Sequence, residues 1–97
     1  MIIGVPKEIK NNEKRVGLIP SSVLELTKIG HKVIVETNAG IGIDASDYDY
    51  RESGAEISTS KEIFAKSDLI IKVKEPQKNE WEQLSSNQIL FTYLHLA

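Results

Sequence analysis

The chain has 97 residues, no cysteine and a formal net charge of -2, which allow one small domain and exclude disulfides and thiolate metal sites. This weak negative charge gives no electrostatic support for a nucleic-acid partner. The start of the chain lacks a basic leader followed by a long apolar segment, and no apolar run reaches the roughly 18 residues of a membrane span. We therefore expect a soluble, cytoplasmic protein without a membrane partner.

The first strand is predicted over residues 2–5, an apolar run that ends at Pro6. Proline cannot donate to a strand ladder and favours extended geometry in the residue before it. The polar stretch 7–15 follows, with two adjacent asparagines at its middle, and predicts a loop. At nine residues it is longer than most connections, and long loops after strands often carry functional sites.

A helix is predicted over residues 22–29, because Ser22 and Glu25 have the spacing of a capping box. Gly30 supplies a residue suited to the left-handed conformation that commonly ends a helix. The alternating run 32–36 then predicts a second strand rich in β-branched residues. Together these elements form a β-α-β unit.

The middle of the chain repeats the alternation of helix and strand on a smaller scale. Ser46 or Asp47 can cap a short helix that Gly54 ends, and residues 55–57 predict a weak strand. Thr59, with a glutamate three residues later, is a second capping-box match and predicts another short helix.

The stretch 68–76, D-L-I-I-K-V-K-E-P, is almost continuously apolar before its end, as expected of a central strand covered on both faces. One or two helical turns over 79–84 and a last strand over 88–96 complete the chain. The alternation predicts an α/β fold: a mainly parallel, open sheet of about five strands with flanking helices, of Rossmann-like or flavodoxin-like type. No helix follows to cover the last strand, so we expect exposed apolar surface there, buried by self-association or by a carboxyl-terminal partner polypeptide.

Three basic side chains follow the carboxyl ends of predicted strands: Arg15, Lys74 and His95. Side chains at that edge of an open α/β sheet converge on one crevice, and two cations with an imidazole suit a small carboxylate. Arginine binds a carboxylate with two parallel hydrogen bonds, lysine stabilises a developing oxyanion, and histidine transfers protons near neutral pH. Taken alone, Arg15 or Lys74 is better explained as a solvated charge, and His95 is equally explained as a core histidine. His31 is most simply a partner of a helix terminus.

Residues 40–45, G-I-G-I-D-A, match the pattern G-x-G-x-x-G/A of dinucleotide-binding loops and follow a strand. That fingerprint must open a helix directly, whereas Asp44, Ser46 and Asp47 crowd the position of a pyrophosphate. The acidic residues of this region, which include Asp49, do not follow the pattern of a calcium loop either, and helix capping explains them. We expect neither a cofactor site nor a metal site here.

Four blocks of the sequence, at 3–20, 30–40, 68–76 and 89–97, resemble the amino-terminal segment of the alanine dehydrogenase family. The first block is shared with the alpha subunit of NAD(P) transhydrogenase, which has a related fold. The later blocks K-V-K-E-P and F-T-Y-L-H-L resemble the alanine dehydrogenase versions, and the transhydrogenase typically lacks the histidine that corresponds to His95.

The resemblance implies that Arg15 binds the substrate carboxylate, that Lys74 binds substrate and takes part in catalysis, and that His95 is the catalytic acid/base. The implied reaction converts L-alanine, NAD and water to pyruvate, ammonia and NADH in an oligomeric enzyme, a hexamer by the family. Residues 1–97 would be the amino-terminal part of the substrate-binding domain, with the dinucleotide-binding domain absent, so this chain alone is expected to bind no NAD and to be inactive. The alternatives are a transhydrogenase alpha-subunit fragment and a non-catalytic protein that binds small anions or acts by association.

Overall fold

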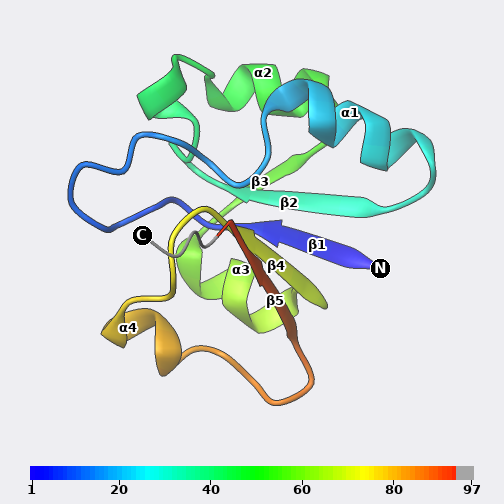
Figure 1. Cartoon of the computed structure of the whole chain (residues 1–97). Helices are drawn as coiled ribbons and strands as arrows, with labels where there is room; N and C mark the ends of the chain where they lie inside the picture. Colours follow the sequence, from blue (N-terminus) through cyan, green and yellow to red (C-terminus); the bar gives the residue numbers. More distant parts are fainter. Residues whose placement is uncertain (94–97) are drawn as a thin grey trace.

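The computed structural model describes residues 1–93, so His95 lies outside the described residues. The described part contains a five-stranded, all-parallel sheet with the strand order β3-β2-β1-β4-β5 (Figure 1). The strands are β1 (Ile2–Val5), β2 (Lys32–Glu36), β3 (Glu56–Ser58), β4 (Leu69–Lys72) and β5 (Ile89–Thr92). The predicted α/β fold with about five parallel strands is confirmed.

Helices flank the sheet on both faces. α1 and α2 lie on one face and α3 on the other, while α4 lies beside the edge where the strands end (Figure 1). The helical elements are α1 (Pro20–Lys28), the 3₁₀ turn η1 (Ile41–Ile43), α2 (Asp47–Glu52), α3 (Ser60–Lys66) and α4 (Lys78–Trp81). Among the described residues, no helix has both the length and the apolar character needed to cross a bilayer.

β1, and not β4, is the central strand, which corrects the expectation for residues 68–76. β1 pairs with β2 on one side and with β4 on the other, and β5 pairs with the other edge of β4. β4 is still an interior strand, with Ile70 and Ile71 buried, which explains its apolar run. The chain leaves β1 toward α1 and leaves β4 toward α4, on opposite sides of the sheet (Figure 1). Ligands of open α/β sheets bind at such a switch point.

α1 begins two residues before the predicted start. Its N-cap is Ile19, which is extended at φ -83° and ψ 161°, and Pro20 occupies the first helical position. Proline fits there because its missing N–H would have no helical partner and its fixed φ suits a helix. Ser22 therefore lies inside the first turn, and the predicted capping box with Glu25 is wrong.

The other helix ends follow the sequence more closely. Ser46 caps α2 in a reciprocal capping box with Asp49, and Thr59 caps α3 by accepting the Glu62 N–H. Gly30 and Gly54 both have left-handed φ values, 97° and 99°, as predicted for residues that follow helices. The strand predicted over 88–96 is shorter in the structure, since β5 ends at Thr92 and residues 94–96 lie outside the described residues.

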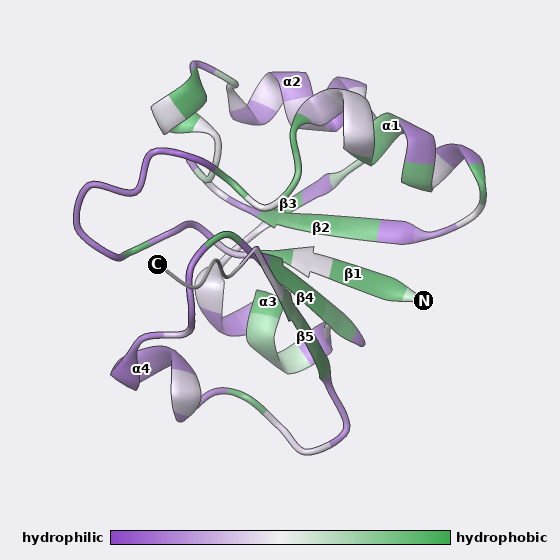
Figure 2. Cartoon of the chain, in the orientation of Figure 1, coloured by the Kyte–Doolittle hydropathy of each residue, from purple (hydrophilic) through white to green (hydrophobic). Residues whose placement is uncertain are grey.

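The main hydrophobic core lies between the sheet and the α1–α2 layer, with Tyr50 of α2 fully buried within it. Figure 2 shows the apolar strands surrounded by more polar helices and loops. The Tyr50 hydroxyl donates a hydrogen bond of 2.7 Å to the Leu18 carbonyl oxygen. This bond satisfies the polar end of a buried side chain and ties α2 to the segment that leads into α1.

Burial raises the pKa of Tyr50 to about 12. An unfolded tyrosine titrates near 10, so the stability that the neutral phenol contributes is fully present below about pH 10. As the pH rises from about 10 to 12, the free energy of unfolding should fall by roughly 2–3 kcal/mol from this group. Urea unfolding at several alkaline pH values measures the fall. Tyr50→Phe should remove most of this pH dependence, whereas Tyr48→Phe, at an exposed tyrosine, should keep it; equal curves for all three proteins would contradict the assignment.

β5 exposes large apolar side chains at the edge of the sheet. Ile89 is 57% exposed and Phe91 52% exposed, and Leu90 and Tyr93 are also exposed. The uncovered last strand therefore has the exposed apolar surface that the sequence predicted. Its burial by self-association or by a carboxyl-terminal partner stays a prediction.

Candidate anion-binding site at the carboxyl edge of the sheet

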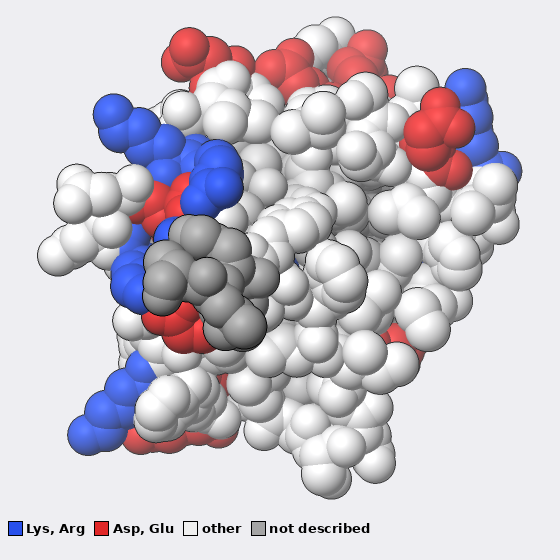
Figure 3. Space-filling model, in the orientation of Figure 1, with Lys and Arg blue, Asp and Glu red and all other residues white. Residues whose placement is uncertain are grey.

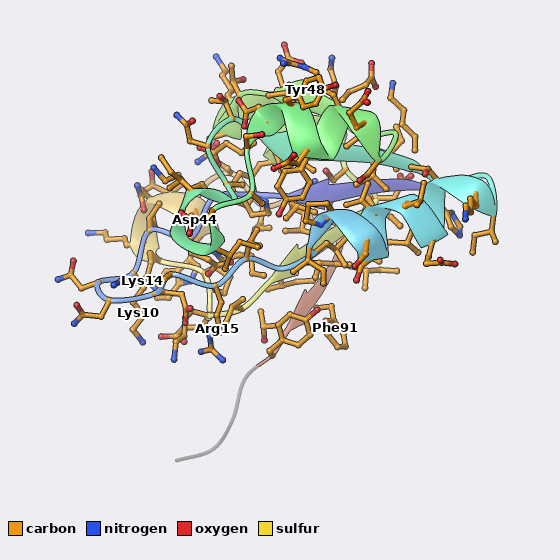
Figure 4. All side chains as sticks on the ribbon, turned by 90° about the horizontal axis from the view of Figure 1, so that it is seen from above. Lys10, Lys14, Arg15, Asp44, Tyr48 and Phe91 are labelled. Carbon is orange, nitrogen blue, oxygen red and sulfur yellow. The ribbon has the colours of Figure 1, made fainter. Side chains whose placement is uncertain are left out.

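The candidate site lies where the loop after β1 meets the segment after β4. Cationic and anionic side chains alternate along this edge of the molecule in Figure 3. Lys10, Lys14 and Arg15 all extend from the loop after β1 (Figure 4). Lys10 forms an ion pair with Glu75, which follows β4, and this pair joins the two segments.

Backbone geometry brings Arg15 toward the end of β4. Asn12 takes a left-handed φ of 65° in a turn closed by the Glu13 N–H and the Lys10 carbonyl oxygen, a conformation that asparagine tolerates well. Gly17 then passes so close to β4 that an added Cβ would lie 2.3 Å from the Ile71 carbonyl oxygen. A side chain at position 17 would therefore push the loop away from the sheet.

Glu13 holds the Arg15 guanidinium through one edge. Arg15 donates from Nε to Glu13 Oε2 at 3.0 Å and from Nη2 to Oε1 at 2.9 Å, and its backbone N–H donates to Oε2 at 2.8 Å. These bonds lower the pKa of Glu13 and raise that of Arg15, chiefly through the side-chain hydrogen bonds. The Arg15 side chain remains 63% exposed, whereas Glu13 is only 4% exposed. Arg15 thus has a fixed orientation and an accessible outer edge.

Lys74 reaches the same carboxylate from the other segment. Its Nζ lies 3.8 Å from Glu13 Oε1, and its side chain is 25% exposed. The structure therefore brings together two of the three predicted site residues, Arg15 and Lys74, around one carboxylate. The third, His95, lies outside the described residues. β5, however, ends at Thr92 beside Lys72 of β4, three residues before His95 in the chain.

A buried charge network supports the base of the site. Lys72 is 1% exposed, and its Nζ lies 3.2 Å from both Glu8 Oε1 and Glu80 Oε2. Glu8 also accepts the backbone N–H groups of Val73 and Lys74, at 3.0 and 3.1 Å. The network fixes the backbone of Lys74 to the loop after β1 and to α4, because buried charges are stable only when they are paired and hydrogen-bonded.

Sequence reasoning missed Glu8, Glu13, Lys72 and Glu80. A signal for the network was present in I-I-K-V, because a lysine inside a buried strand requires a carboxylate partner. The loop after β1 contains two glutamates, at 8 and 13. Because β1 and β4 are parallel neighbours, this loop lies at the same edge of the sheet as that lysine. No signal in the sequence alone assigns one glutamate to Lys72 and the other to Arg15.

The glycine-rich stretch 40–45 forms η1 and a turn, and not the start of a long helix. Gly42 packs against the loop after β1, since an added Cβ would lie 2.2 Å from the Lys14 carbonyl oxygen. A cavity of about 180 Å³ between the two loops is lined by residues that include Glu13, Arg15 and Ala39. The acidic residues are used locally: Asp49 caps α2, and Asp47 accepts from the Thr37 hydroxyl and the Asn38 N–H. The stretch therefore does not open a long helix directly, as the dinucleotide fingerprint requires.

The sequence matches the family described as "Alanine dehydrogenase/PNT, N-terminal domain" over residues 4–97. It is 55% identical to an alanine dehydrogenase of Methanococcus maripaludis and 54% identical to alanine dehydrogenase 2 of Staphylococcus aureus. Both alignments cover the whole chain, which spans 26% of the length of each relative.

Solved structures agree with the sequence comparison. An L-alanine dehydrogenase superposes with a TM-score of 0.93 at 50% identity, over 98% of this chain and 26% of the other. A transhydrogenase from Sinorhizobium meliloti superposes with a TM-score of 0.91 at 31% identity, over 97% of this chain and 27% of the other. The matched family, the sequence relatives and the two structures agree with one another, and the chain belongs to the alanine dehydrogenase/PNT N-terminal domain family.

Proposed function

We propose that this chain is the substrate-side part of an NAD-dependent alanine dehydrogenase, which interconverts L-alanine and pyruvate. The observation that carries the proposal is that Arg15 and Lys74, from loops after two adjacent strands, meet at one carboxylate. Two cations with exposed faces at the switch point of a parallel sheet suit a small carboxylate ligand. The residues form the amino-terminal part of a substrate-binding domain.

Each side chain has a distinct role in the proposal. Arg15 binds the substrate carboxylate through the part of its guanidinium that Glu13 leaves accessible. Lys74 orients the oxo or imino group and stabilises the negative charge that develops on oxygen. His95 transfers protons as water adds to the imine carbon and as the amine leaves. NAD supplies the hydride acceptor in the complete enzyme, and we do not propose the glycine-rich stretch as its site, because η1 does not begin a long helix.

A transhydrogenase alpha-subunit fragment is the second candidate. The fold similarity to the Sinorhizobium meliloti protein favours it, but the lower identity, 31% against 50%, ranks it below alanine dehydrogenase. A non-catalytic protein that binds small anions with the same two cations is the alternative from a different class. Cytoplasmic localisation and assembly with a carboxyl-terminal part or with further copies belong to the same proposal.

Replacement of Arg15 by lysine tests the proposed site. The charge remains but the planar fork is lost, so pyruvate should bind roughly 5- to 100-fold more weakly. The measurement is the dissociation constant of pyruvate for the 97-residue chain, from shifts of backbone amide signals in NMR titrations. Arg51→Lys is the matched control, because Arg51 is an exposed arginine on α2. Unchanged pyruvate binding in Arg15→Lys, or an equal loss in Arg51→Lys, would refute the assignment.

A further inference from the structure

We propose that Glu13 is a specificity-determining residue, which restricts the Arg15–Lys74 site to substrates with a single negative charge. The inference rests on the proposed function, because it concerns the same two cations. It assigns a role in ligand selection to Glu13 and explains why a carboxylate lies between the two side chains that are proposed to bind one.

Glu13 belongs to the site because it contacts both of its cations directly. Three hydrogen bonds of 2.8 to 3.0 Å join it to Arg15, and its Oε1 lies 3.8 Å from Lys74 Nζ. No other described carboxylate forms an ion pair with either cation. With a side chain only 4% exposed, Glu13 is held in one position against Arg15, so its charge acts on a ligand that binds beside the two cations.

Charge balance then decides which anions fit. Arg15 and Lys74 would together neutralise two negative charges, but Glu13 already accounts for one of them. Hydrogen bonds from Arg15 lower the pKa of Glu13, so it stays ionised at neutral pH. A monocarboxylate completes the balance of these three side chains, whereas a dicarboxylate of similar size places its second negative charge near the Glu13 carboxylate, which repels it. Such repulsive elements are a common source of specificity.

Oxamate and oxalate provide a direct test, since both have the size of pyruvate but oxamate carries one negative charge and oxalate two. The 97-residue chain is titrated with each compound at neutral pH and one fixed low ionic strength, and binding is followed by NMR. The wild-type chain should bind oxamate at least as tightly as oxalate. In Glu13→Gln, the ratio of the two dissociation constants should shift toward oxalate by about tenfold.

The ratio of the oxamate and oxalate dissociation constants distinguishes selection of ligand charge by Glu13 from a purely structural role of Glu13. If Glu13 only oriented Arg15, Glu13→Gln would weaken both ligands equally and the ratio would not move. Glu56→Gln is the control for net charge, because Glu56 pairs with Lys32 at the opposite edge of the sheet, and its ratio should equal that of the wild type.

The outcomes distinguish this inference from the proposed function. If oxamate binding depends on Arg15 but the ratio in Glu13→Gln stays within about twofold of the wild type, only the role of Glu13 is overturned. If Arg15→Lys leaves oxamate binding unchanged, or if the wild type binds none of these anions, the proposed function fails and the inference fails with it. Should Glu13→Gln not fold, a wild-type chain that prefers oxalate by about tenfold would still refute charge selection.

Discussion

Replacing Lys72 with methionine is expected to lower the free energy of unfolding by about 3–5 kcal/mol. Methionine keeps most of the side-chain volume but leaves Glu8 and Glu80 buried without their cation, at 2% and 4% exposure. Removing one partner of a buried charge network costs far more than the network contributes, because the remaining charges stay desolvated. Small domains are stable by only about 5–15 kcal/mol in total, so much of the variant should be unfolded well below the denaturant midpoint of the wild type.

Urea unfolding followed by circular dichroism measures this change. Lys66→Met is the matched control, since Lys66 forms an exposed ion pair with Glu62 on α3, and exposed pairs contribute little. A variant that combines Glu8→Gln, Lys72→Met and Glu80→Gln should recover a large part of the loss, because no unpaired charge remains. A Lys72→Met variant as stable as Lys66→Met would show that Glu8 and Glu80 do not need Lys72 as a buried counter-charge.

The fold was predictable because its signals are local. Apolar runs marked the strands, glycines at 30 and 54 marked helix ends, and the alternation of elements indicated a parallel sheet. The start of α1 was not predicted, because two signals competed: Ser22 has the capping-box spacing, but Pro20 is better suited to the first helical turn. The order of the strands was missed for a different reason. An apolar run shows that a strand is buried on both faces, but it does not show which buried strand lies at the centre.

Only the site residues that follow predicted strands could be identified from the sequence. Arg15 and Lys74 were selected because they follow strands, and the pairing of β1 with β4 places those strands side by side. Their shared contact with Glu13 depends on the turn at Asn12 and on the close approach of Gly17 to β4, which are properties of the folded loop. The same holds for the pairing of Lys72 with Glu8, which is 64 residues away in the chain. Contacts between residues so distant in sequence are set by the sheet topology and not by any local pattern.

Replacement of His95 by alanine is expected to reduce turnover by roughly 100-fold or more in a complete alanine dehydrogenase that contains this chain. The reason is its place in the chain: β5 pairs with β4 up to Thr92, so the segment that carries His95 starts at the same sheet edge as Lys74. In the proposed reaction, His95 transfers protons both as water adds and as ammonia leaves. Steady-state rates with L-alanine and NAD, across a range of pH, give the change in kcat.

His31 provides the control for this variant, because it follows Gly30 and precedes β2 and therefore lies at the opposite edge of the sheet. His31→Ala should leave kcat nearly unchanged. A loss confined to kcat in His95→Ala, with pyruvate binding retained, identifies an interaction made only in the transition state. A loss of pyruvate affinity with normal turnover would instead make His95 a binding residue. Near-normal values of both would leave His95 without a role in the reaction, and acid/base catalysis would have to come from another group.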